Sequence, residues 1–151
     1  MLLEHQLVPQ AVAKPGSFVG LMALYESNYL RLLQLVPEIE RLDGYYRSGV
    51  AGDCDLHLEI LDRSRYTVTL SLTYFFYEGA QRIADPDMQI RLYLDCNLAE
   101  AMSLSGNHRH AGFRRLVREH KKELDARWQR NIVLNKWLEY LSDHGHLILE
   151  R

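Results

Sequence analysis

The sequence predicts an α+β fold, with an antiparallel sheet of four to six strands and an N-terminal and a C-terminal helix packed on one face. Three observations predict it: apolar side chains alternate over 66–74 and 88–95, they follow helical spacing over 17–36 and 124–143, and short links join the strand segments. Alternation is typical of strands that bury one face. Short links favour antiparallel pairing, because a parallel pair needs a crossover of about a dozen residues.

The chain has 151 residues, of which 47% are hydrophobic, enough for one core without disulfides. We expect residues 1–16 to be an irregular lead-in and residues 17–151 to form a single α+β domain. Cys54 and Cys96 make no disulfide framework, and no run approaches the roughly 18 apolar residues of a membrane span. These features predict a soluble, cytoplasmic protein with no membrane partner.

The first helix begins after Ser17, a residue suited to an N-cap, and Pro37 ends it. The first hairpin joins a strand over 54–61 to the central strand through a turn at 62–65, and a short edge strand is expected around 45–47. Gly79, Asp85 and Pro86 fall in a predicted connection to the next strand. The sheet and the last helix together predict a core that includes Val68, Leu70, Leu72, Ile90, Leu92, Trp128 and Leu138.

The second half of the chain continues with a tight turn or a bulge at 95–97 and a further strand over 98–104. The segment 106–122 has no clear period, and its middle is compatible with another strand. The last helix covers 124–143, and Gly145 is suited to the position just past its end.

Several blocks of sequence have a recognisable order and spacing: Glu26-Ser-Asn-Tyr29, Ser64-Arg-Tyr-Thr67, Met88-Gln-Ile-Arg-Leu-Tyr-Leu-Asp95 followed by Ala99-Glu100, and Asp125-Ala-Arg-Trp-Gln-Arg-Asn131 leading to Trp137-Leu138 and His144-Gly145. Over about residues 21–145 they resemble the YqiB-like family of small proteobacterial proteins, a domain of unknown function. The chain has Leu116-Val-Arg118 where that family tends to have Tyr-Pro-Asn, and Asp125-Ala-Arg127 where it tends to have Asp-Glu-Lys. The resemblance implies no activity, cofactor or catalytic residue.

Charge is unevenly placed along the chain. Residues 1–105 carry 8 basic and 14 acidic side chains, whereas residues 106–151 carry 10 basic and 6 acidic ones. The basic segment 109–122 offers candidate ligand- or anion-binding residues: Arg109, Arg114, Arg115 and Arg118. Clustered guanidinium groups can neutralise phosphates, but they can also form a solvated edge that discourages aggregation. The sequence pI near 6.4 favours the second reading and makes nucleic acid an unlikely partner.

No catalytic or metal constellation is visible along the sequence. His108, His110 and His120 lie close together, but neither a cysteine nor a carboxylate completes a metal shell near them, so we expect solvated histidines. Phosphate-binding glycine loops and a Gly-x-Ser-x-Gly elbow are also absent. The expectation is therefore no catalytic residue, no metal and no cofactor.

Glu100 is the one anomaly in the strand pattern. If the strand over 98–104 keeps the even residues inward, Glu100 points into the core face, where an ionised carboxylate needs a partner. Arg127 and Asn131 form a polar line on the last helix at a spacing of four. We therefore predict a structural polar cluster of Glu100 with Arg127 or Asn131.

These observations favour an uncharacterised, non-catalytic cytoplasmic module that binds a protein or a small ligand through the open sheet face or the aromatic run 74–77. The alternatives are an enzyme acting on a phosphorylated or other anionic substrate and a weak nucleic-acid binder, both using segment 109–122. A concave pocket that collects perturbed acids or histidines beside Arg114 and Arg115 would favour the enzyme.

Overall fold

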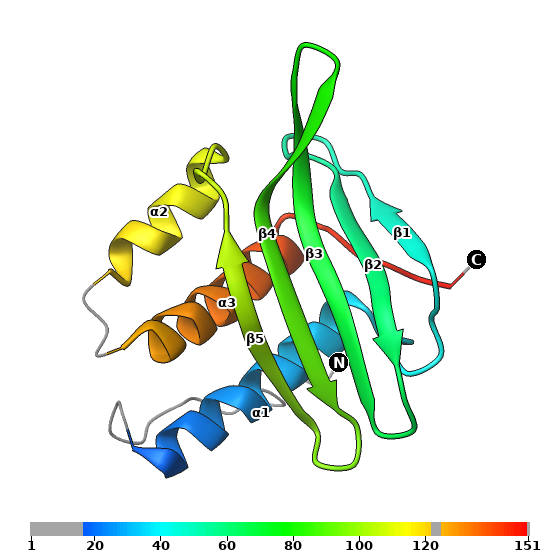
Figure 1. The fold of residues 1–151 in the computed structure, drawn as a ribbon, viewed down its shortest axis with the longest axis vertical. Coiled ribbons are helices and arrows are strands. Elements are labelled where there is room, and N and C mark those ends of the chain that lie inside the picture. Colours follow the sequence, from blue (N-terminus) through cyan, green and yellow to red (C-terminus); the bar gives the residue numbers. More distant parts are fainter. Residues whose placement is uncertain (1–16, 122–124, 151) are drawn as a thin grey trace.

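The computed structural model describes residues 17–121 and 125–150, so the predicted lead-in 1–16 and the predicted helix start at Leu124 lie outside the described residues. Within them, a five-stranded antiparallel sheet has the order β1-β2-β3-β4-β5, and helices precede and follow it (Figure 1). The elements in chain order are α1 (Phe18–Leu35), β1 (Tyr45–Ser48), β2 (Leu56–Arg63), β3 (Thr67–Glu78), β4 (Gln81–Tyr93), β5 (Leu98–Ser105), α2 (Ala111–Glu119) and α3 (Ala126–Asp143). The predicted α+β class is confirmed.

Helix α1 begins after Ser17 and ends before Pro37, as predicted, and α3 ends at Asp143, its predicted last residue. Ser17 caps α1 by accepting a hydrogen bond from the Gly20 N–H at 3.0 Å, and Asp125 caps α3 by accepting one from the Trp128 N–H at 2.8 Å. Gly145, just past α3, has φ +90°, a left-handed conformation that glycine adopts without strain. No helix in the part of the chain described here has the length and apolar character needed to cross a bilayer.

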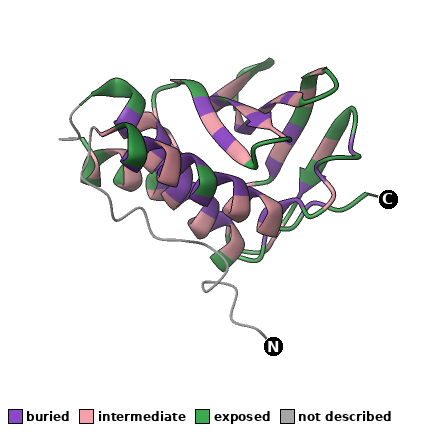
Figure 2. Ribbon diagram, turned by 90° about the horizontal axis from the view of Figure 1, so that it is seen from below, coloured by how far each residue is buried: buried purple, intermediate pink, exposed green. Residues whose placement is uncertain are grey.

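The core lies between the sheet and the pair α1 and α3, as Figure 2 shows from below. Most even-numbered apolar side chains of β2, β3 and β4 face the helices and are fully buried, among them Leu70 and Ile90. Six of the seven predicted core residues pack in this cluster. Trp128 is also buried, but it belongs to a smaller cluster with Leu21, Leu24 and Tyr25.

The hairpin of β3 and β4 is longer than the sequence pattern predicts. The aromatic run 74–77 continues β3 to Glu78, and Gln81 already begins β4, so the expected connection through Asp85 and Pro86 was wrong. A bulge at Thr73 and Tyr74 places both residues in the interior, and this shift interrupts the alternation.

The register of β5 also differs from the prediction. A four-residue turn joins β4 to β5, with Asn97 in a left-handed conformation at φ +57°, and it pairs Tyr93 with Leu98. Ala99 and Ala101 therefore face the core in place of Leu98 and Glu100. A bulge at Met102 then restores the even register, so that Leu104 pairs with Met88. The predicted inward position of Glu100 was wrong because the turn contains one residue more than the even register allows.

Candidate functional site

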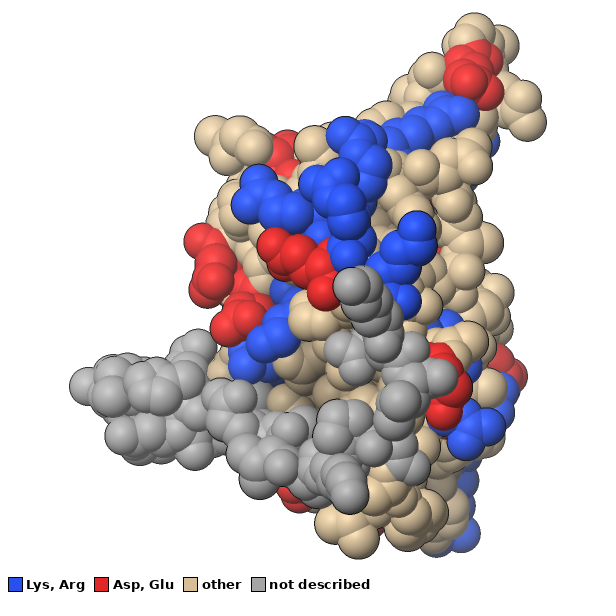
Figure 3. All heavy atoms as spheres, turned by 90° about the vertical axis from the view of Figure 1, so that its left-hand side faces the viewer, with Lys and Arg blue, Asp and Glu red and all other residues tan. Residues whose placement is uncertain are grey.

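The basic segment forms a helix, α2, and the strand considered for its middle was wrong. Phe113 is buried on the inner side of α2, whereas Arg114, Arg115 and Arg118 are exposed on its outer side. Figure 3 shows Lys and Arg side chains gathered over this part of the molecule, with acidic side chains among them. Lys122, at the end of the predicted segment, lies outside the described residues.

The four candidate arginines do not form one anion site. Arg109 forms an ion pair with Glu78 at 3.0 Å, and its Nε lies 3.7 Å from Asp85. Arg114 donates to the backbone oxygens of His108 and Arg109 at 3.1 and 3.4 Å. Arg115 instead lines a depression on the other side of α2 with Tyr140 and His144. Two of the four guanidinium groups are thus engaged in holding the loop before α2.

The predicted polar cluster is divided between two places. Glu100 accepts hydrogen bonds from the hydroxyls of Tyr25 and Tyr93 at 3.1 and 3.0 Å, so the predicted bond to Arg127 or Asn131 is replaced by two tyrosines. The Asn131 side chain accepts from the Ala101 N–H at 2.7 Å and donates to the Arg127 backbone oxygen at 2.9 Å. Asn131 therefore joins helix to sheet without the help of Glu100.

The loop before α2 is organised by one buried carboxylate. Asp85, 1% exposed, accepts the backbone N–H groups of Asn107, His108 and Arg109 at 3.2, 2.9 and 3.2 Å. Gly106 has φ +125°, and a Cβ there would lie 2.5 Å from the Asp85 carboxylate. These bonds hold His108 at φ +58°, a left-handed conformation that is strained for a residue with a side chain.

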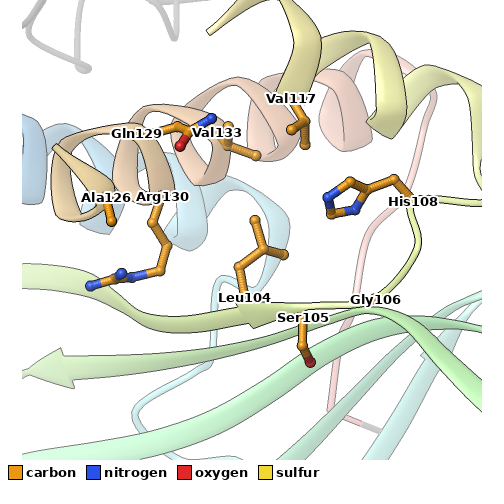
Figure 4. Close-up of a pocket in the computed structure, with 9 residues that line it drawn as sticks. All are labelled: Leu104, Ser105, Gly106, His108, Val117, Ala126, Gln129, Arg130 and Val133. Atoms are coloured by element: carbon orange, nitrogen blue, oxygen red, sulfur yellow. The ribbon is translucent and has the colours of Figure 1, made fainter. Parts of the chain in front are cut away.

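The loop directs the His108 ring into a cavity of about 260 Å³ between β5, α2 and α3. We call it the His108 cavity, and its lining consists of Leu104, Ser105, Gly106, His108, Val117, Ala126, Gln129, Arg130 and Val133. Figure 4 shows the His108 ring, Val117 from α2 and Leu104 from β5 pointing toward the same space, whereas Ser105 points to the other side of β5. The walls are mainly apolar.

Two polar groups distinguish the His108 cavity from a packing defect. His108 Nδ1 is buried and has no hydrogen-bond partner among residues 17–121 and 125–150. Arg130 also lines the cavity, and it donates from Nε to the Ala101 oxygen at 2.9 Å. Its guanidinium group extends toward β5, away from the His108 ring (Figure 4). No carboxylate occurs among the described lining residues. As far as residues 17–121 and 125–150 show, the cavity therefore combines apolar walls with one unpartnered nitrogen, one arginine and no carboxylate.

A second cluster surrounds Asp53, in the loop between β1 and β2. Its carboxylate contacts His110 Nε2 at 2.6 Å and His146 Nε2 at 2.9 Å. Tyr74 and Tyr140 donate their hydroxyls to the same carboxylate at 3.4 and 3.5 Å. The Asp53 side chain is 2% exposed, so one buried carboxylate joins the β1–β2 loop, β3, the start of α2, α3 and the C-terminal segment.

The electrostatics of the cluster favour an ionised Asp53 carboxylate beside a protonated Tyr140 hydroxyl and a protonated Cys54 thiol. Burial alone would raise the pKa of Asp53, but hydrogen bonds from His110 and His146, and the charge of His110, bring the pKa below its ordinary value. Burial and the Asp53 charge raise the pKa of the Tyr140 hydroxyl, and burial raises that of the Cys54 thiol. Cys54 is therefore a thiol at neutral pH, which makes it a poor nucleophile.

The cluster contains a Ser-His-Asp chain whose serine is buried. Ser48 Oγ lies 2.9 Å from His146 Nδ1, and His146 Nε2 contacts Asp53. Ser48 is 6% exposed and accepts the Leu147 N–H at 3.2 Å. A nucleophile must reach the reacting carbon, and Ser48 is buried. We therefore interpret the hydrogen bonds among Ser48, His146 and Asp53 as contacts that hold the C-terminal segment against the rest of the domain.

The sequence-based expectations missed both sites. The expectation of solvated histidines was wrong for His110, which stacks on Tyr74 with ring centroids 4.3 Å apart and is 9% exposed. Asp53 and His110 are separated by 57 residues, and no local sequence pattern indicates that they are in contact. The unusual conformation of His108 was equally hidden, since it depends on Asp85 in another strand.

Comparisons with known proteins identify a family but no specific activity. A search of the curated proteins gave no match, and a search of the solved structures gave none either. A family model described as "Protein of unknown function (DUF1249)" matches residues 31–147, a range that includes Asp53, His108, His110 and Arg130. The chain therefore belongs to the DUF1249 family of proteins of unknown function.

Proposed function

We propose that the protein is a non-catalytic binding module that holds a small organic acid with an apolar body in the His108 cavity. The observation that carries this proposal is the buried, unpartnered Nδ1 of His108. A buried polar atom without a hydrogen bond lowers stability, so its retention points to a partner that arrives with a ligand.

The other features of the cavity define the chemistry of that ligand. A volume of about 260 Å³ exceeds the roughly 150 Å³ cavity that binds benzene, so a body of about ten non-hydrogen atoms fits. Leu104, Val117 and Val133 supply apolar contact, and Arg130 supplies the charge that favours a carboxylate. A ligand with a carboxylate at one end and an apolar body matches both.

An enzyme acting on an anionic substrate is the weaker proposal. A pocket with an acid and a histidine does lie beside Arg115, as that alternative requires. However, both nitrogens of His110 are engaged, by Asp53 at 2.6 Å and by the Phe113 N–H at 3.1 Å, and no free general base remains in that ring. Nucleic acid is disfavoured as a partner because Arg109 and Arg114 are used within the protein.

We further propose that the chain is a YqiB-like, proteobacterial member of its family, acting in the cytoplasm as a single domain over residues 17–151. The sequence blocks that resemble that family support the first part. The free thiols of Cys54 and Cys96 support a reducing compartment.

Thermal unfolding with matched pairs of ligands tests the function. We expect straight-chain and aromatic carboxylates, such as hexanoate and benzoate, to raise Tm more than the corresponding amides. At 100 times Kd a single site adds about 2.7 kcal/mol, or roughly 5–10 °C for a domain of this size. Calorimetric titration should give one site per chain.

Three variants locate the binding. Val117→Phe should fill the cavity and so abolish the increase in Tm that the ligands cause. Arg130→Gln should reduce the increase in Tm caused by a carboxylate to the increase caused by the corresponding amide. Arg115→Gln is the matched control, because it removes the same charge from the opposite side of α2. If carboxylates and amides raise Tm equally, or if Val117→Phe leaves the shift unchanged, the proposal is wrong.

A further inference from the structure

The shallow depression beside the N-terminus of α2 has a volume of about 540 Å³ and is independent of the His108 cavity. Asp53, Cys54 and His110 line it, and one carboxylate oxygen, the sulfur and one imidazole nitrogen all lie within 4.8 Å of one another. We propose that these three residues form a binding site for a transition-metal ion of the Zn²⁺ class, with a fourth position open to water.

The donor types select the class of metal. Thiolate sulfur and imidazole nitrogen suit Zn²⁺ and Co²⁺, whereas Mg²⁺ and Ca²⁺ prefer oxygen ligands. Bond lengths of about 2.0–2.3 Å in a tetrahedral site separate the ligand atoms by roughly 3.3–3.8 Å. His110 Nε2 and Asp53 Oδ1 lie 2.6 Å apart, so these two donors must separate by about 1 Å to admit a metal ion, whereas the Cys54 sulfur, within 4.8 Å of them, needs to approach by at most about 1 Å. The open side of the depression gives a water molecule access to the fourth position.

The surroundings of Asp53 orient one oxygen for the metal. His146 and Tyr74 contact Oδ2 at 2.9 and 3.4 Å, and Ser48 holds the other side of the His146 ring. Oδ1 faces His110 and Tyr140 in the depression. Residues that hold a ligating carboxylate in this way commonly improve metal affinity by 10–100-fold.

Metal binding requires a change at His110. Its Nδ1 accepts the Phe113 N–H at 3.1 Å, so Nε2 carries the proton that it donates to Asp53. A metal at Nε2 displaces that proton, and a neutral ring must then carry its proton on Nδ1, which ends the capping bond of α2. Loss of one N-cap lowers affinity by roughly 2- to 30-fold, a modest factor beside the contribution of three ligands. The thiol of Cys54 binds as a thiolate and releases its proton to solvent.

Titration of the full-length protein with Co²⁺ tests the site, because a cobalt–thiolate bond gives a charge-transfer absorption band. We expect one equivalent of Co²⁺ to produce that band together with the visible bands of tetrahedral coordination, and Zn²⁺ to displace it. Mg²⁺ should have no effect.

Two variants and one control assign the ligands. Cys54→Ser should remove the charge-transfer band and weaken Zn²⁺ binding at least tenfold, whereas Cys96→Ser, at the exposed cysteine, should change neither. His110→Asn should weaken binding at least tenfold while keeping a residue that caps α2 well. A titration without a charge-transfer band, or a band that survives Cys54→Ser, would overturn the proposal.

Discussion

Replacing Asn131 with alanine should weaken the attachment of α3 to β5. Asn131 is fully buried, and it pairs with the Ala101 N–H at 2.7 Å and the Arg127 oxygen at 2.9 Å. After the substitution, the Ala101 oxygen still accepts a hydrogen bond from Arg130 Nε, and the Asn28 amide still donates one to the Ala99 oxygen at 3.4 Å. The Ala101 N–H is the group left buried without a partner.

The magnitude follows from that one orphaned donor and the space left behind. An unsatisfied buried N–H destabilises by about 1–3 kcal/mol, and a small cavity adds about 1 kcal/mol. We therefore expect Asn131→Ala to lower the free energy of unfolding by about 2–4 kcal/mol. For a domain of this size the corresponding decrease in Tm is roughly 5–12 °C.

Urea unfolding followed by circular dichroism measures this loss, and an unchanged m-value would show that the two-state transition is retained. Asn107→Ala serves as the control, because Asn107 is exposed and its substitution should change stability by less than about 0.5 kcal/mol. A loss below about 1 kcal/mol for Asn131→Ala would refute the role given to this side chain.

The remaining predictions concern pH and backbone conformation. Burial and a neighbouring carboxylate raise the pKa of Tyr25 to about 12. The contribution of the Tyr25 hydroxyl to stability is therefore complete below pH 10 and is lost as the pH rises toward 12. In Tyr25→Phe the urea midpoint should depend less on pH over that range. Burial lowers the pKa of His57, so stability should decrease as pH falls below about 6.5, and less so in His57→Gln. Gly106→Ala should lower the free energy of unfolding by about 1–3 kcal/mol more than Gly79→Ala does. A Cβ at Gly106 would lie 2.5 Å from the Asp85 carboxylate, whereas a Cβ at Gly79 would have no atom within 4 Å. Equal losses in the two variants would contradict this reasoning.

Local chemistry explains which parts of the fold could be predicted from the sequence. Ser17 and Pro37 mark the limits of α1 through local effects, a side-chain cap at one end and the restricted backbone before a proline at the other, so its bounds were correct within a residue or two. The register of β5 depended on the number of residues in one turn, and a difference of one residue reverses the faces of a strand. Glu100 was therefore assigned to the wrong face.

The functional residues could not be predicted because they meet only in space. The environment of His110 is made by Asp53, Tyr74 and Tyr140, which come from three other elements. The short helix α2 was missed because arginines occupy much of it and only Phe113 is buried. Its apolar side becomes recognisable once α3 is in place to cover it.

The bonds made by Asn131 have a consequence for self-association. β5 is an edge strand, and its outward backbone groups at Ala99 and Ala101 are occupied by side chains of Asn28, Asn131 and Arg130. A strand offered by a second chain would have to displace these side chains before it could pair there. At the opposite edge, β1 has only four residues. These two features oppose growth of the sheet by pairing of its edges with those of a second molecule.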